Sequence, residues 1–232
     1  MSLDRSRDRT DIAAGAVLAG AALLSLAAIL HHPTLQGPHE AQAAAEAIRS
    51  LGPLDRLIHG TLMLVAFIQT VAFARVSARL GFRSAAILAG FSAYAAGSIV
   101  LVIPATLDGF VTPDLADRCL AAADCGASHA AVTELVGVAI QDFTKVALSA
   151  LSLATLCWSI GIVGRPGPMP RAVGLVGLVC ALAPLAALWL SDLHLRPDNL
   201  AIILSAQLVW NIAVAALMLT GAGSFPQGAR GP

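Results

Sequence analysis

The sequence predicts an all-α integral membrane protein, a bundle of six transmembrane helices with both termini in the cytoplasm. Hydrophobic residues make up 57% of the 232 residues and charged residues 12%. The mean hydropathy of +0.79 lies outside the range of ordinary soluble domains. Six apolar runs each approach or exceed the ~20 residues that a helix needs to cross ~30 Å of hydrocarbon. The expected partner is therefore the lipid bilayer, and the sequence contains neither a basic cluster for nucleic acid nor a nucleotide-binding motif.

The chain is predicted to form one transmembrane domain with two short tails. Residues 1–11 are a polar cytoplasmic tail, residues 12–221 are the six-helix domain, and residues 222–232 are a disordered tail. The predicted spans are 12–30, 57–74, 84–107, 135–163, 172–190 and 200–219, and the outer loops are 31–56 and 108–128.

The first apolar run, 12–30, is interpreted as a span. Ala41-Gln42-Ala43 loosely resembles a signal-peptide cleavage site. The run is nevertheless long for the core of a signal peptide and matches the length of a membrane-spanning helix.

Each outer loop is predicted to contain a short helix. In the first loop this helix begins at Pro38 and is ended by Gly52 and Pro53. In the second loop, Thr112-Pro113-Asp114 has the features of a helix start: a capping residue, a proline at the first helical position and an acid in the first turn.

The later spans differ in character. The third is rich in Gly, Ala and Ser, which suits close packing between helices. The fourth is the second half of one long helix from His129 to Val163. The fifth follows a proline-rich turn and is expected to be kinked at Pro184.

The basic residues determine the predicted orientation, since they favour the cytoplasmic side. Nine of the thirteen arginines share the side of the termini: Arg5, Arg7, Arg9, Arg75, Arg79, Arg83, Arg165, Arg171 and Arg230. Eleven of the fourteen acids fall on the other side, so the outer face should attract cations. The abundance of arginine and alanine is typical of GC-rich bacterial genomes. The predicted location is the inner membrane, with the outer face periplasmic or extracellular.

All six histidines fall on the predicted outer side. Five of them lie near helix ends and are the predicted metal ligands, with zinc or copper as the metal: His31, His32, His59, His129 and His194. Met63 shares a helical face with His59 and would favour Cu(I). The alternative is that these interfacial histidines bind nothing, because polar residues in general gather outside the spans.

A polar stripe is predicted to face the interior of the bundle. It consists of Glu134, Gln141, Asp142 and Lys145 on the fourth helix and Gln207 and Asn211 on the sixth. Such residues line pathways in membrane proteins or form hydrogen bonds between helices. Two cysteines on the outer side, Cys119 and Cys125, are predicted to form a disulfide, with a zinc site shared with His129 as the alternative.

Three functions are compatible with this pattern. The first is an outward-facing His/acidic site that binds a metal ion or small cationic ligand for uptake, sensing or assembly. The second is a membrane-embedded enzyme, either a metallohydrolase using His59, Asp108, His129 and His194 or a haem- or quinone-linked oxidoreductase. Haem is the weaker option because the histidines lie at the membrane edge. The third is a small-solute or proton-coupled transporter that uses the polar stripe.

Overall fold

The computed structural model describes residues 9–33, 41–122, 125, 127–191, 195 and 197–221. Every regular element in these residues is helical: α1 (Arg9–Leu30), α2 (Ala41–Leu80), α3 (Ala85–Thr106), the π-helical turn η1 (Leu107–Val111), α4 (Thr112–Ala121), α5 (Ala127–Val163), α6 (Pro168–Leu190) and α7 (Pro197–Thr220). Six segments are long and apolar enough to cross a membrane, with α3, η1 and α4 counted as one. The all-helical prediction with six such segments is confirmed. The predicted tail 222–232 lies outside the described residues.

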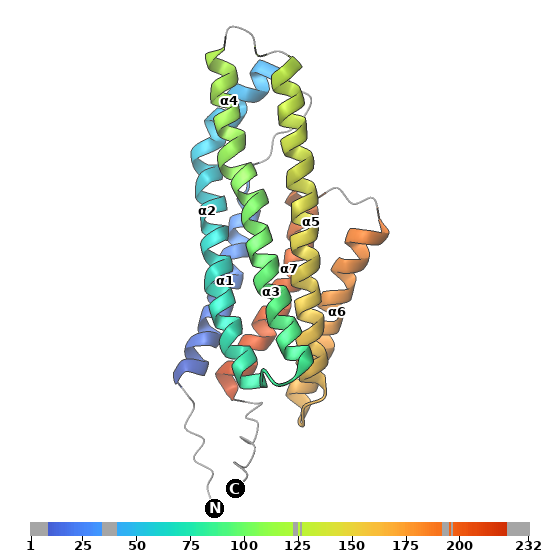
Figure 1. Ribbon diagram of the computed structural model, residues 1–232. Helices are drawn as coiled ribbons and strands as arrows, with labels where there is room; N and C mark the ends of the chain where they lie inside the picture. The colour runs from blue at the N-terminus through green and yellow to red at the C-terminus, as the bar shows by residue number, and fades with distance from the viewer. Residues whose placement is uncertain are drawn as a thin grey trace, which may run out of the picture.

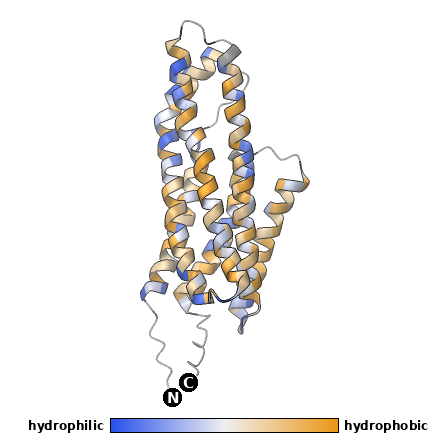
Figure 2. Cartoon of the chain, in the orientation of Figure 1, coloured by the Kyte–Doolittle hydropathy of each residue, from blue (hydrophilic) through white to orange (hydrophobic). Residues whose placement is uncertain are grey.

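The six long segments form a ring (Figure 1). Each packs against the next in chain order, and α7 packs against α1, which closes the ring. We call the end at which α1 begins and α7 ends the terminal end, and the opposite end the distal end. Figure 2 shows apolar residues along most of each helix, with polar residues more frequent toward the two ends. Many large apolar side chains face outward, among them Leu64, Val71 and Ile99, as lipid contact would require.

Three of the segments are much longer than the others. α2 has 40 residues, α5 has 37, and the segment of α3, η1 and α4 has 37, about 60, 55 and 55 Å at 1.5 Å per residue. In contrast, α1, α6 and α7 have 22, 23 and 24 residues. The long segments therefore project past the short ones at the distal end (Figure 1). We call this projection, formed by residues 41–54, 112–121 and 127–137, the overhang.

The first outer loop differs from its prediction, because α2 runs through Gly52 and Pro53 without a break. A proline inside a helix removes a hydrogen bond and costs ~3 kcal/mol or more, so continuity here depends on tertiary packing. A Cβ at Gly52 would lie only 3.3 Å from Cβ of Pro113 on α4. The ion pairs Arg49–Asp117 and Arg56–Asp114 also join the two helices. These contacts help keep α2 continuous past its proline.

The second outer loop is also largely helical, and η1 is the reason. The backbone N–H of Thr112 bonds the carbonyl oxygen of Leu107, five residues earlier, so the helix passes from α3 into α4. The predicted start at Thr112 is the first residue of α4, but it is entered from a helix and not from a loop. Single π-helical turns occur frequently at functional sites, and this one carries Asp108.

Four aromatic side chains in mutual contact fill the centre of the ring toward the terminal end, three of them stacked and Tyr94 tilted against them. Phe73, Tyr94, Trp158 and Trp210 come from α2, α3, α5 and α7, and Phe73 lies 4.4 Å from Trp158 and 5.5 Å from Trp210, centroid to centroid. The indole N–H of Trp158 donates to Oγ of Ser77 at 2.9 Å. All four side chains are buried. We call this cluster the aromatic plug, because it closes the middle of the ring.

At the terminal end, α1 begins at Arg9, and Asp11 is only 2% exposed. The predicted solvated tail therefore does not extend to residue 11. The Asp11 carboxylate forms ion pairs with Arg75, at 2.8 Å, and with Arg79. A carboxylate can be buried when cationic groups compensate for its lost hydration, and the two arginines are supplied by the neighbouring helix α2.

Replacing Asp11 with alanine is expected to lower the free energy of unfolding by about 2–3 kcal/mol, because it removes the buried partner of two arginines. The matched control is Asp114→Ala, which breaks the exposed pair with Arg56 and should cost less than about 1 kcal/mol. Denaturant unfolding of the detergent-purified variants measures both values. Equal, small effects would show that the Asp11 pair does not hold α1 to α2.

Candidate metal site

Two histidines and two aspartates from three separate parts of the chain meet inside the ring. Nδ1 of His59 lies 3.1 Å from Oδ1 of Asp55, and Nε2 of His59 lies 3.3 Å from Oδ2 of Asp108. Nε2 of His32 lies 3.7 Å from the same Asp55 oxygen and 3.6 Å from the same Asp108 oxygen. The two imidazole rings meet edge to face, with centroids 5.0 Å apart. We call these four residues the His/Asp cluster.

Each member is positioned by local helix geometry. His32 follows the last turn of α1, while Asp55 and His59 are one turn apart on α2 and so share a face. Asp108 is brought in by η1. The neighbouring Gly109 allows η1 to approach, because a Cβ there would lie 2.7 Å from Cγ of His59.

The backbone holds one nitrogen of each imidazole. Nδ1 of His32 lies 2.8 Å from the carbonyl oxygen of Pro33, and Nδ1 of His59 lies 3.0 Å from that of Asp55. Because a carbonyl can only accept, the tautomer that satisfies each contact has the proton on Nδ1. Both Nε2 atoms then present a lone pair toward the carboxylates. Metal-binding histidines commonly have their second nitrogen held in this way.

A lone pair facing a carboxylate oxygen is unfavourable, so this arrangement requires either a proton or a metal cation between the two groups. The proton can be carried by Nε2 or by the carboxyl group. Oδ1 of Asp55 is buried and accepts no hydrogen bond from any described residue, which is costly for a carboxylate unless a cation compensates. The ligand atoms of His32, Asp55 and His59 lie within 4.8 Å of one another. Ligands of a tetrahedral zinc ion lie ~3.4 Å apart, given bond lengths of ~2.0–2.1 Å, so small side-chain rotations would complete a site.

The His/Asp cluster lines a cavity of about 1020 Å³ within the ring. Its walls come from α1, α2, α3, η1, α5 and α7, and Tyr94 of the aromatic plug forms part of its lining. The plug thus closes the cavity on the terminal side. A metal bound at the cluster would be adjacent to this space.

Two of the predicted histidine ligands, His32 and His59, come together in the structure. His31 is exposed, and its Nδ1 lies 2.8 Å from the carbonyl oxygen of Ala27. His129 lies near the disulfide described below, and His194 lies outside the described residues.

The two aspartates are less evident from the sequence. Asp108 was expected only for a metallohydrolase, and Asp55 was not expected to be a ligand. The spacing Asp55-x3-His59 is the signal that points to Asp55, because it places a carboxylate and an imidazole one helical turn apart.

The predicted polar stripe divides between the cavity and the outer surface. Gln141, Gln207 and Asn211 line the cavity. Glu134 and Asp142 are exposed, which corrects the expectation that they face the interior, and Lys145 is half-buried and is not part of the cavity lining. Glu134 lies in the overhang, beyond the short helices. Asp142 follows Gln141, which lines the cavity, and so lies about 100° further around α5 on a different face of the helix.

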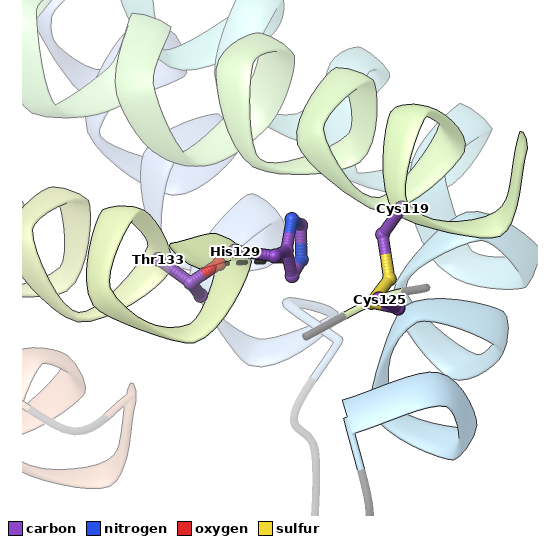
Figure 3. Close-up of a disulfide and its surroundings, with 4 residues drawn as sticks. All are labelled: Cys119, Cys125, His129 and Thr133. Carbon is purple, nitrogen blue, oxygen red and sulfur yellow. Dashed lines mark hydrogen bonds between the residues drawn. A yellow bond between two sulfur atoms is a disulfide. The ribbon is translucent and has the colours of Figure 1, made fainter. Parts of the chain in front are cut away.

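Cys119, near the end of α4, and Cys125 form a disulfide (Figure 3). His129 lies close by on α5, with its Nε2 3.4 Å from Oγ1 of Thr133. The two sulfurs and the His129 imidazole are near enough to hold a metal. Sulfurs joined in a disulfide are not thiolates, however, and only thiolates are effective metal ligands.

Alkylation of the unfolded protein is expected to modify two cysteines, Cys157 and Cys180, without reductant and all four after reduction, because the structure pairs only Cys119 with Cys125. Intact mass measures the number modified. A chelator alone should not change the result. Modification of all four cysteines without reductant would contradict the disulfide. If chelator without reductant made Cys119 and Cys125 reactive, they would be metal ligands and not a disulfide.

Comparison with protein-family models, curated proteins and solved structures found no match. The fold and site themselves define the class: a ring of six apolar helices of membrane-spanning length, with a His/Asp cluster lining a central cavity.

Proposed function

We propose that this chain is a multi-pass membrane protein that binds a divalent transition-metal ion at the His/Asp cluster. The observation that carries the proposal is the orientation of the two imidazoles. Each Nδ1 is held by a backbone carbonyl, and Nε2 of each ring lies within 3.6 Å of Oδ2 of Asp108. A cation at this position would compensate both Asp108 and the buried Oδ1 of Asp55.

Zinc fits the donor set better than copper(I) or haem. Two imidazole nitrogens and carboxylate oxygens are usual ligands of Zn²⁺, whereas Cu(I) favours thiolate and thioether sulfur. None of the four cluster residues carries sulfur, although Met63 lines the same cavity. The rings of His32 and His59, with centroids 5.0 Å apart, leave no space for a macrocycle between them, which argues against haem ligated by this pair.

The proposed location is the inner membrane of a bacterial cell, with both termini cytoplasmic and the metal site facing outward. Arg75, Arg79, Arg83, Arg165 and Arg171 all lie at or near the ends of helices at the terminal end, and cytoplasmic loops are enriched in such residues. A disulfide in the overhang suits an oxidising compartment on the distal side.

The test is a calorimetric titration of chelator-treated, detergent-purified protein with Zn²⁺. One Zn²⁺ per chain is expected. Mg²⁺, which demands octahedral oxygen ligands, serves as the control and should not compete. Failure to bind Zn²⁺ would contradict the proposal and leave protons between the imidazoles and the carboxyl groups as the explanation of the cluster.

A metallohydrolase is the second candidate, and the size of the cavity favours it. A metal ion alone does not require about 1020 Å³ of adjacent space, whereas an enzyme needs room for a substrate beside an open metal position. Transport through the middle of the ring has less support, because the aromatic plug closes the cavity on its terminal side.

A further inference from the structure

The same cavity has a second polar region, deeper than the His/Asp cluster. Gln69 on α2 is ten residues from His59, and Ser98 on α3 is ten residues from Asp108, which places both about 15 Å further in along their helices. Tyr94, Gln207 and Asn211 line the same cavity, and we call these five residues the amide pocket. Its five members carry amide and hydroxyl groups and no charge.

The hydrogen bonds in the amide pocket leave donors available. The hydroxyl of Tyr94 donates to Oε1 of Gln69 at 2.8 Å, and that of Thr155 donates to Oε1 of Gln207 at 3.0 Å. Nε2 of Gln207 is buried and has no hydrogen-bond partner among the described residues. Asn211, one turn further along α7, is 6% exposed and lines the same space. Together, Gln207 and Asn211 offer amide N–H donors to a ligand.

The surroundings of these donors define the ligand they can accept. The lining of the cavity is largely apolar and includes Leu62, Leu101 and Leu148. A charged group would be costly there, because no opposite charge lies among the five members of the amide pocket. An uncharged acceptor such as a carbonyl oxygen would satisfy Nε2 of Gln207 at no such cost. The cavity volume is at the upper end of the range for small-molecule sites.

We propose that the cavity binds an uncharged, largely apolar molecule that presents a carbonyl oxygen to Gln207 and Asn211. The binding is independent of the metal site, since the amide pocket contains none of the four cluster residues. A quinone and an acyl ester of a neutral lipid share this chemistry, and both are soluble in a bilayer.

The experiment measures saturable binding to chelator-treated, detergent-purified protein by native mass spectrometry. The probes are decylubiquinone, which carries quinone carbonyls, 1-monooleoylglycerol, which carries an ester carbonyl, and hexadecane, which carries no oxygen. At least one carbonyl probe is expected to bind once per chain, about tenfold more tightly than hexadecane. Tighter binding of decylubiquinone would indicate a quinone as the ligand, and tighter binding of 1-monooleoylglycerol would indicate an acyl lipid.

Two variants connect binding to the amide pocket. Gln207→Leu and Asn211→Leu should each lower the affinity for the carbonyl probe about tenfold. Gln42→Leu makes the same change at an exposed position on α2 and should leave binding unchanged. Gln207→Leu removes the hydrogen bond from Thr155 and could disturb the fold. Asn211→Leu keeps the test decisive in that case, because no described side chain depends on Asn211 for a hydrogen bond. The proposal is overturned if neither carbonyl probe saturates, if hexadecane binds equally well, or if both leucine variants bind like the wild type.

Discussion

Replacing His59 with alanine is expected to lower the affinity for Zn²⁺ by at least about 100-fold. His59 is the most central member of the His/Asp cluster, with one nitrogen 3.1 Å from Asp55 and the other 3.3 Å from Asp108. Loss of a residue that only orients a metal ligand costs 10–100-fold in affinity, so loss of a ligand should cost at least as much. His32→Ala should have a similar effect. Calorimetric titration of the chelator-treated variants measures the change.

The adjacent histidine provides a matched control. His31 precedes His32 in the sequence, but it is exposed and bonded to Ala27 of its own helix, so His31→Ala should retain wild-type affinity. His129→Ala should also retain it, because His129 is absent from the cavity lining. Equal losses in His31→Ala and His32→Ala would mean that zinc binds to surface histidines and not at the cluster.

Replacing Gly109 with alanine is expected to destabilise the fold by about 1–3 kcal/mol and to weaken Zn²⁺ binding as well. The added Cβ would lie 2.7 Å from Cγ and 2.9 Å from Nδ1 of His59, so η1 or the imidazole must move. Overpacking at a close contact typically costs this much. Thermal unfolding and zinc titration of the same preparation measure the two effects together.

Gly60 is the matched control, because it neighbours His59 on α2 but has open space where a Cβ would be added. Gly60→Ala should be neutral or stabilising by up to ~1 kcal/mol, since alanine is the better helix former. A Gly109→Ala variant as stable as Gly60→Ala would show that η1 does not depend on close contact with His59. A stable Gly109→Ala variant that loses zinc would instead confine the effect to the position of the imidazole.

The tertiary structure joins features that are separate in the sequence. The polar stripe and the histidines were expected to support competing functions, yet Gln141, Gln207 and Asn211 line the same cavity as His32 and His59. The stripe residues that would couple ions, Glu134 and Asp142, are exposed instead. The structure therefore places an ionisable site and an uncharged pocket in one cavity, without a charged path along α5.

Helix length and apolar character could be predicted because both are local properties of the chain. The helix expected from His129 to Val163 is observed as α5, Ala127–Val163, and the six apolar runs correspond to the six long segments. Apolar side chains have no alternative to the bilayer or the ring interior, so a run of about twenty determines a span whatever its neighbours are. The same reasoning fails where the sequence contains helix-breaking residues. Pro53 was expected to end a helix, but packing against α4 keeps α2 continuous.

The members of the site depended on tertiary structure. The sequence by itself predicted that the histidines gather on one side of six apolar segments, because the side of each loop follows from counting the predicted spans, and the four histidines in the described residues do lie toward the distal end. It did not determine which of them meet, because contact between His32, His59 and Asp108 requires closure of the ring and the π-helical turn η1 that carries Asp108. Burial of Asp11 likewise depends on two arginines supplied by a different helix. Hydropathy is set residue by residue, whereas a contact between distant side chains is set by how whole helices pack.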